Sequence, residues 1–214
     1  MRPRVHYIPT GMYAMKTETV SDTKEKLLDA AQGLMLEKGF VATSIDEICE
    51  AAGLTKGSFF HYFENKEELG KVLVRRFSET MGAHFNEAAC SCGSADPLDR
   101  IYACIDAAIE MSKDPKSKGC LVGTLTQELY ESHPNIRSVC CESFAAGVRF
   151  FKKTLAEAKT KYAPRSPVDP EALAEMYLAT VQGSMILMKA TKDRSVMERT
   201  LQNYKAYVKS IFEK

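Results

Sequence analysis

The chain has 214 residues, of which 45% are hydrophobic and 27% charged, and its formal net charge is +1. This composition is typical of a globular protein that can bury a proper core in one large or two small domains, and no run approaches the ~18 apolar residues of a membrane span. Residues 1–88 carry 11 Lys and Arg against 13 Asp and Glu. This balance counts against broad electrostatic attraction as the main mode of any nucleic-acid binding, because affinity for phosphate scales with local cations.

Seven cysteines form no recognisable disulfide framework in a chain of this length. Their odd number and the absence of a secretory signal predict reduced thiols and a cytoplasmic protein. Residues 1–21 show no periodicity, so we expect a disordered or extended tail there, with Met12 or Met15 nearer the biological start.

An apolar stripe at helical spacing, closed by Gly39, predicts a first helix over residues 23–38. Asp22 and Glu25 give this helix an acidic amino-terminal end. We expect Phe40, just beyond the helix, to pack into a small three-helix core.

The next stretch, SIDEICEAAGLTKGSFFHYF, predicts two short helices joined by a tight turn. Ser44 starts the first helix in a capping box with Glu47, because each side chain can satisfy a backbone amide at the helix start. Gly53 ends this helix, since a left-handed residue costs least without a side chain. Thr55 then caps the second helix, residues 56–63. The pair predicts a helix-turn-helix.

The second of these helices, with the turn before it, contains no carboxylate, which suits a helix that enters a DNA groove. We expect Lys56 to donate to a base edge, Gly57 to allow close backbone approach, and Phe59 to touch a thymine methyl. His61 is a further predicted DNA contact. The side chains expected to hold phosphates and set the register are Ser44, Thr55, Ser58, Tyr62 and Lys66.

The run from Thr43 through Phe63 to Leu69 resembles the amino-terminal domain of TetR-family repressors, over roughly residues 23–73. The resemblance implies an all-helical homodimer that binds double-stranded operator DNA. It also implies a variable carboxy-terminal domain whose small-molecule effector lowers DNA affinity, with repression the usual outcome and activation the less common one. Family members often carry tyrosine where Phe60 stands, so one phosphate contact is in doubt and Phe60 is a candidate core residue.

A long helix opens at Asn65, which is expected to form another capping box with Glu68. The residues of this helix expected to face inward are Leu69, Val72, Leu73, Phe77 and Thr80. The helix is long enough to pass from a DNA-binding domain, residues 22–66, into a ligand-binding and dimerisation domain, residues 67–214. It would therefore link the two domains mechanically.

The rest of the chain predicts helices separated by loops at residues 90–97, 112–119 and 162–169. Two helices start with an aspartate followed by proline, at Asp96 and Asp169. No strand-like alternation occurs, so the predicted fold class is all-α, with about nine helices.

Two of these helices are rich in small residues, namely Ala145, Ala146 and Gly147 in one and Ala172, Ala174, Ala179, Gly183 and Ser184 in the other. Small residues let helix backbones approach closely. They suit either a four-helix interface between two subunits or tight packing within one chain, and the resemblance favours the dimer.

The second domain combines apolar and aromatic residues with a few polar ones, as in a small-molecule pocket. The candidates chosen by helical phase are Tyr102, Cys120, Thr124, Glu128, Phe144, Tyr177, Val181 and Met185. Each is otherwise plain core. A mainly apolar or aromatic effector is the hypothesis that follows.

Cys120 follows Lys118 and Gly119 at a predicted helix start, where the helix dipole and nearby cations favour a thiolate. The segment Gly119–Val122 also resembles that of electrophile- and oxidant-responsive TetR repressors. A thiol-based redox or electrophile sensor is therefore the alternative hypothesis, and a small buried residue is the simpler interpretation.

The sequence contains no phosphate loop, zinc-protease motif or nucleophile elbow, so we expect neither an enzyme nor a cofactor. Cys90, Cys92 and His84 lack a fourth ligand at suitable spacing, and no metal site is predicted. The expected partners are operator DNA, a small-molecule effector and a second copy of the chain, with no membrane.

Overall fold

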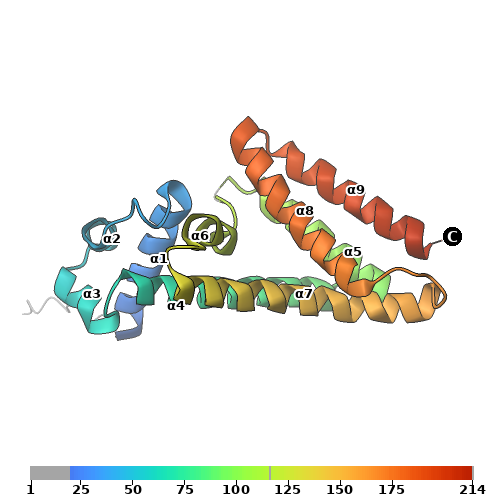
Figure 1. Cartoon of the computed structure of the whole chain (residues 1–214), viewed down its shortest axis with the longest axis horizontal. Coiled ribbons are helices and arrows are strands. Elements are labelled where there is room, and N and C mark those ends of the chain that lie inside the picture. The colour runs from blue at the N-terminus through green and yellow to red at the C-terminus, as the bar shows by residue number, and fades with distance from the viewer. Residues whose placement is uncertain (1–19, 116, 214) are drawn as a thin grey trace, which may run out of the picture.

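The structure, a computed structural model, describes residues 20–115 and 117–213, with side chains from Asp22 onward. Residues 1–19 of the predicted tail lie outside the described residues. Nine α-helices and no strand make up the described part of the chain (Figure 1), which confirms the predicted all-α fold. The helices are α1 (Val20–Lys38), α2 (Ile45–Ala52), α3 (Lys56–Tyr62), α4 (Lys66–Ser91), α5 (Pro97–Lys113), α6 (Leu121–Leu129), α7 (Pro134–Tyr162), α8 (Pro170–Thr191) and α9 (Ser195–Phe212).

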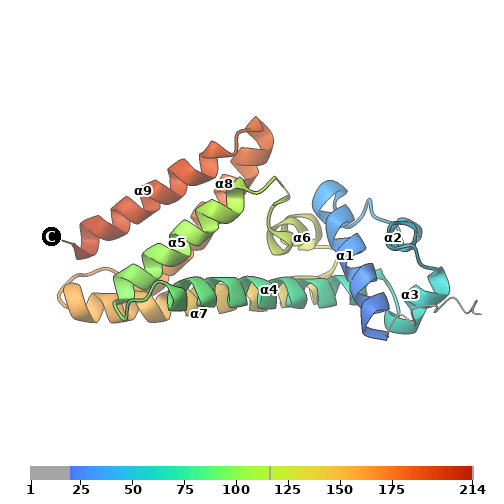
Figure 2. The ribbon, with the colours of Figure 1, turned by 180° about the vertical axis from the view of Figure 1, so that it is seen from behind.

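Two long helices, α4 and α7, run side by side along the molecule and form its base (Figures 1 and 2). Helices α1, α2 and α3 gather at one end, and α5, α8 and α9 at the other. The short helix α6 lies between them, beside α1. No helix in the described chain is both long and apolar enough to cross a bilayer.

Local sequence signals set most helix ends. Ser44 and Glu47 form the predicted capping box, and Thr55 caps α3 by accepting a hydrogen bond from the Ser58 amide. Asn65 caps α4 as predicted, but the Glu68 carboxylate pairs with Lys71 (2.6 Å). Asp96 and Asp169 cap α5 and α8, each followed by proline. Each cap depends on residues within a few positions of the helix start, so these helix starts could be predicted from the sequence.

The first hydrophobic core joins the helix-turn-helix to part of the second domain. It packs buried residues of α1, α2, α3 and the first half of α4 against Leu121, Leu125 and Leu129 of α6 and Ile136 of α7. This core includes residues on both sides of the domain boundary that the sequence predicts at residue 66. The boundary stays a prediction.

The second core is built from α5, the later part of α7, α8 and α9. Phe151 and Tyr177 stack with ring centroids 4.0 Å apart, and the Tyr204 hydroxyl donates to the Leu173 carbonyl (2.9 Å). Burying these large side chains fixes α8 and α9 against α5 and α7.

Several details differ from the sequence prediction. Helix α1 begins at Val20, inside the predicted tail, and α3 ends at Tyr62, one residue before its predicted end. Thr80 was expected to face inward, but its side chain is exposed and its hydroxyl donates to the Arg76 carbonyl (2.9 Å), one turn back. Helix α4 also continues to Ser91, so the loop expected from residue 90 begins after that residue. The helix ends where Gly93, in the left-handed region (φ 69°), lets the chain turn.

Candidate DNA interface and effector cavity

Helix α3 is positioned by one buried ring. The Phe59 side chain is fully buried and contacts Phe63, with ring centroids 5.5 Å apart. The predicted thymine contact of Phe59 is therefore wrong, because this ring is part of the core. Phe60 is 54% exposed, so its assignment to the core is wrong as well. Successive helical residues point about 100° apart, and in this helix it is Phe59 that points inward.

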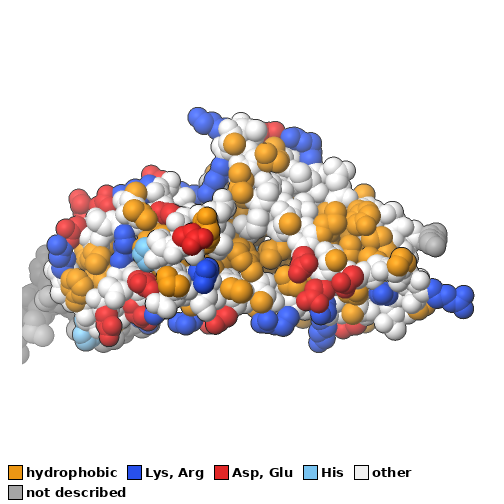
Figure 3. All heavy atoms as spheres, in the orientation of Figure 1, with side chains coloured by type: hydrophobic (Ala, Val, Ile, Leu, Met, Phe, Trp, Pro, Cys, Tyr) orange, Lys and Arg blue, Asp and Glu red, His pale blue; other side chains and the backbone are white. Residues whose placement is uncertain are grey.

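Lys56 lies at the first position of α3 and is well exposed, as a base-reading residue must be. Its ammonium forms an ion pair with Asp46 of α2 at 2.7 Å, and the two side chains are 61% and 64% exposed. The cation predicted to donate to a base edge therefore has an acidic neighbour. Figure 3 shows the same mixture of acidic and basic side chains over this end of the molecule.

Three hydroxyls of the predicted phosphate set take part in helix starts. The Ser44 hydroxyl accepts from the Glu47 amide (3.2 Å), and the Thr55 hydroxyl lies 3.1 Å from that of Ser58. Ser44 and Thr55 remain exposed, and Ser58 is half-buried. Their contact with phosphate stays a prediction.

Gly57 is not required by the fold around it. A Cβ placed there would meet only the Thr55 hydroxyl, at 3.6 Å, which is an ordinary contact. A requirement for glycine at this position would come from a partner that approaches the helix. His61 is exposed and Tyr62 half-buried, with ring centroids 4.7 Å apart, and both stay predicted DNA contacts.

Lys66 does not offer a phosphate a free ammonium. Its Nζ donates to the carbonyls of Phe40 (2.8 Å) and Thr43 (2.7 Å) and lies 4.5 Å from the centre of the Phe40 ring. Partial burial lowers the pKa of this lysine, while the nearby Glu128 carboxylate opposes that shift. The predicted phosphate contact is corrected: Lys66 holds the turn between α1 and α2.

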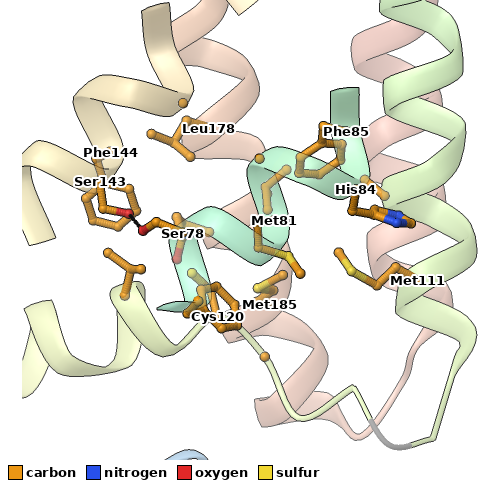
Figure 4. A pocket seen from close by; sticks show the side chains of 18 of the residues that line it. Ser78, Met81, His84, Phe85, Met111, Cys120, Ser143, Phe144, Leu178 and Met185 are labelled. Carbon is orange, nitrogen blue, oxygen red and sulfur yellow. Dashed lines mark hydrogen bonds between the residues drawn. The ribbon is translucent and has the colours of Figure 1, made fainter. Parts of the chain in front are cut away.

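A cavity of about 780 Å³ lies mainly in the second domain, and Gln32 and Leu36 of α1 also line it. Its wall comes mainly from α4, α5, α7 and α8, with the start of α6 and the segment before it (Figure 4). Apolar side chains dominate, among them Phe85, Phe144, Met111 and Met185. A mostly apolar pocket with a few polar groups is what a small-molecule site requires.

Five of the eight predicted ligand residues line this cavity, namely Cys120, Phe144, Tyr177, Val181 and Met185. Tyr102, Thr124 and Glu128 lie outside it, and their predicted placement is corrected. The Tyr102 hydroxyl donates to Glu213 (2.9 Å), and burial raises the pKa of this tyrosine far above its usual range. Tyr102 therefore faces α9 and the end of the chain.

Sequence reasoning missed the contribution of α4 to the cavity. Phe77, Met81 and Phe85 recur every four residues and line the wall, so the spacing that marks one helix face was present in the sequence. The polar pair Ser78 and Ser143 was also missed. Their hydroxyls hydrogen-bond to each other across α4 and α7 at the cavity wall (Figure 4).

Cys120 stands at the amino-terminal end of α6 with its side chain at the cavity. Its sulfur accepts a hydrogen bond from the Gly123 amide at 3.4 Å. Met185 of α8 lines the same cavity (Figure 4). Among the seven free cysteines, Cys49, Cys104 and Cys140 are buried, and burial raises the pKa of the Cys104 thiol to about 12.

No group of three or more His, Cys, Asp or Glu side chains in the described chain could hold a metal ion. His84 lies in the cavity wall (Figure 4), while Cys90 and Cys92 are exposed near the end of α4. The structure joins the helix-turn-helix of α2 and α3 through α4 to a domain with an apolar cavity. That arrangement defines a helix-turn-helix transcriptional regulator with a larger helical second domain.

Comparison with known proteins names the family. The family model described as "Bacterial regulatory proteins, tetR family" matches residues 27–71, and the model "Tetracyclin repressor-like, C-terminal domain" matches residues 97–204. The chain belongs to the TetR family, and its members are transcriptional regulators rather than enzymes.

Three relatives illustrate the match. The transcriptional regulator AcuR of Cereibacter sphaeroides is 31% identical over 166 residues, covering 77% of this chain and 75% of the relative. The repressor DhaR of Mycobacterium sp. (strain GP1) is 28% identical over 182 residues, covering 83% of this chain and 88% of the relative. The crystal structure of a TetR regulatory protein from Rhodobacter sphaeroides is 26% identical, with a TM-score of 0.78 over 86% of this chain and 97% of that one.

Proposed function

We propose that the protein is a cytoplasmic transcriptional repressor that binds a near-palindromic operator as a homodimer and is released by a small, mainly apolar effector. One observation carries the proposal: α4 begins beside the DNA-facing helices, at Lys66, and its later residues form the wall of the apolar cavity. Occupancy of the cavity can therefore act on the position of the helix-turn-helix.

The dimer is supported by an uncovered apolar face on α8 and α9. Ile186, Leu187 and Tyr207 are 49%, 52% and 46% exposed. Hydrophobic side chains gather along α8 on the face seen in Figure 3. The small residues Ala179 and Gly183 are exposed too, whereas Ala174 and Ser184 are buried within the chain. Pairing this face with a second copy would bury apolar surface and form a four-helix interface.

Operator binding by such a dimer depends on the distance between its two α3 helices. Half-sites one helical turn apart must match that distance, so a small displacement of α4 lowers affinity. An effector shifts the equilibrium only by its difference in affinity for the two arrangements.

The test uses two substitutions on α3, Lys56→Ala and Tyr62→Ala. Each should reduce operator binding by at least tenfold, because each removes a base or phosphate contact, while the helical circular dichroism and the unfolding midpoint stay near wild type. Arg165→Gln, an exposed change in the loop between α7 and α8 at the far end of the molecule, is the control. Unchanged operator binding in both α3 variants would overturn the site.

A second candidate function rests on Cys120. Its thiol lies at the cavity wall, and the Gly123 amide donates to its sulfur at 3.4 Å. We propose electrophile or oxidant sensing through this thiol as the alternative to reversible effector binding. In Cys120→Ser, N-ethylmaleimide and hydrogen peroxide should no longer release DNA; release at the wild-type dose would exclude Cys120 as the sensor.

A further inference from the structure

Glu128, a predicted ligand residue, contacts the DNA-binding helices instead of the cavity. It lies in the last turn of α6, and its carboxylate accepts hydrogen bonds from two consecutive backbone amides, Phe40 (2.7 Å) and Val41 (2.8 Å). These amides belong to the turn Gly39–Thr43, which joins α1 to α2. Hydrogen bonds to an ionised acceptor are about twice as strong as neutral ones.

The turn is shaped for this contact. Gly39 has a φ of 89°, a conformation that other residues rarely adopt, and a Cβ there would lie 2.9 Å from both Glu128 oxygens. Glycine thus serves two needs at once: it permits the turn and leaves room for the carboxylate.

The opposite side of the turn is held by Lys66 of α4, which donates to the carbonyls of Phe40 and Thr43. A carboxylate from α6 therefore binds the amides of the turn, and an ammonium from α4 binds its carbonyls. The Phe40 ring is buried, and the Cβ position of Gly70 lies 3.0 Å from it. The position of the turn, and with it the start of α2, is consequently set by α4 and α6 together.

The other end of α6 lies at the cavity, where Cys120 caps the helix and Val122 lines the wall. The segment before α6 is also tied to α1, through an ion pair between Lys118 and Glu37 at 2.8 Å. Helix α6 is only nine residues long, and Leu121, Leu125 and Leu129 along its length all pack in the first core, which joins its two ends.

We propose that Glu128 is a positioning residue for DNA binding, through which displacement of α6 at the cavity frees the turn before α2. This proposal rests on the proposed repressor function and adds a second route beside α4. The Glu128 side chain is exposed, so breaking its contact leaves no buried charge, and the contact can open and close reversibly.

The first test measures amide hydrogen exchange in the full-length protein, with a peptide that covers residues 37–44. Glu128→Ala should speed exchange of this peptide at least tenfold, and Glu128→Gln by a smaller factor, because the amide keeps one acceptor oxygen. Glu131→Gln, the same chemical change at an exposed position beyond α6, is the matched control and should leave the rate unchanged. Wild-type exchange in Glu128→Ala would overturn the proposal.

The second test displaces α6 without any effector. A Cβ at Gly123 would overlap the side-chain amide oxygen of Gln182, which is the flexible end of that side chain. Because Gly123 is buried, the branched side chain of Gly123→Val needs more room than rotation of Gln182 alone provides and should push α6 away from α8. Glu128 lies five residues further along α6 than Gly123. We therefore expect faster amide exchange of residues 37–44 in Gly123→Val, and partial recovery of the wild-type rate in the double variant with Gln182→Ala. Unchanged exchange at the turn in Gly123→Val would refute the link.

DNA binding completes the test, with a duplex that the wild-type protein selects from a random pool. Glu128→Ala should bind it roughly tenfold more weakly, and Glu131→Gln as tightly as wild type. Wild-type affinity in Glu128→Ala would contradict a positioning role. If the wild-type protein selects no duplex, the repressor function itself fails, while the exchange measurements still decide whether Glu128 holds the turn.

Discussion

Lys56 of α3 and Asp46 of α2 form an ion pair 2.7 Å long at the surface that we propose for DNA. Both side chains are well exposed, so the pair contributes about 0–1 kcal/mol to stability. Its larger effect is on binding, because Asp46 both occupies the lysine and repels phosphate. Asp46→Asn should therefore tighten operator binding about three- to tenfold without a change in the unfolding midpoint.

The control for this prediction is Glu50→Gln, which removes a charge from the same helix at another exposed position. It should change affinity less than Asp46→Asn in fluorescence-anisotropy titrations. Lys56→Ala should also relax the base preference at the operator position that Lys56 contacts, as expected for the loss of a base-edge contact. A weaker complex in Asp46→Asn would contradict the assigned role of the pair.

The adjacent rings Phe59 and Phe60 should respond to substitution in opposite ways. Phe59 is fully buried, so Phe59→Ala should cost about 3–5 kcal/mol of unfolding free energy. Phe60→Tyr adds a hydroxyl to an exposed ring and should change stability by less than about 0.5 kcal/mol. If that hydroxyl reaches a phosphate, as the family pattern suggests, operator affinity should rise severalfold.

Urea unfolding and DNA titration of the same two variants check this pair of predictions. Substantial destabilisation by Phe60→Tyr, or little loss in Phe59→Ala, would mean that the two rings are exchanged.

The features of the DNA-binding helices that could be predicted from the sequence were local ones. The caps at Ser44, Thr55 and Asn65 depend on neighbours within three or four residues, and all were located. The burial of Phe59 rather than Phe60 was not predictable, because a seven-residue helix with two adjacent rings fits either phase. The helical phase of such a short element is decided by the core it meets.

Prediction of the cavity from the sequence was also limited to local patterns. Five of the eight predicted lining residues lie in its wall, since apolar phase is readable along a helix. Glu128 was misplaced because its partners, the amides of Phe40 and Val41, are 88 and 87 residues away in the chain. The role of Lys66 was missed for the same reason: its partners are the carbonyls of a turn more than 20 residues earlier.

Two glycines with positive φ should differ in their cost of substitution. Gly53 (φ 66°) has nothing within 4 Å of its Cβ position, so Gly53→Ala should cost about 1–2 kcal/mol from backbone strain alone. Gly39→Ala would add the displacement of the Glu128 carboxylate and should cost about 3 kcal/mol. Urea unfolding midpoints give both values, and equal costs would contradict the close approach of Glu128.

Stability should depend on pH through Glu47. The ion pair with Lys38, together with hydrogen bonds from the Ser44 amide and hydroxyl, lowers the pKa of this carboxyl from 4.5 to about 2. A lowered pKa means that the stabilisation is present above about pH 4.5 and is lost as the pH falls toward 2. Wild type should therefore unfold at higher urea concentration than Glu47→Gln at pH 7, and the gap should close by pH 2.

Glu50→Gln, an exposed change on the same helix, corrects for the general effect of removing a carboxylate. A gap between wild type and Glu47→Gln that stays constant from pH 7 to pH 2 would contradict the assigned cause.

The most direct measurement is binding of the purified protein to the intergenic DNA beside its own gene, across a salt series, with the stoichiometry measured in parallel. We predict tight, sequence-selective binding by a dimer, with affinity that falls steeply as salt rises. Weak binding that is indifferent to sequence, or binding by a monomer, would contradict the proposed dimeric repressor.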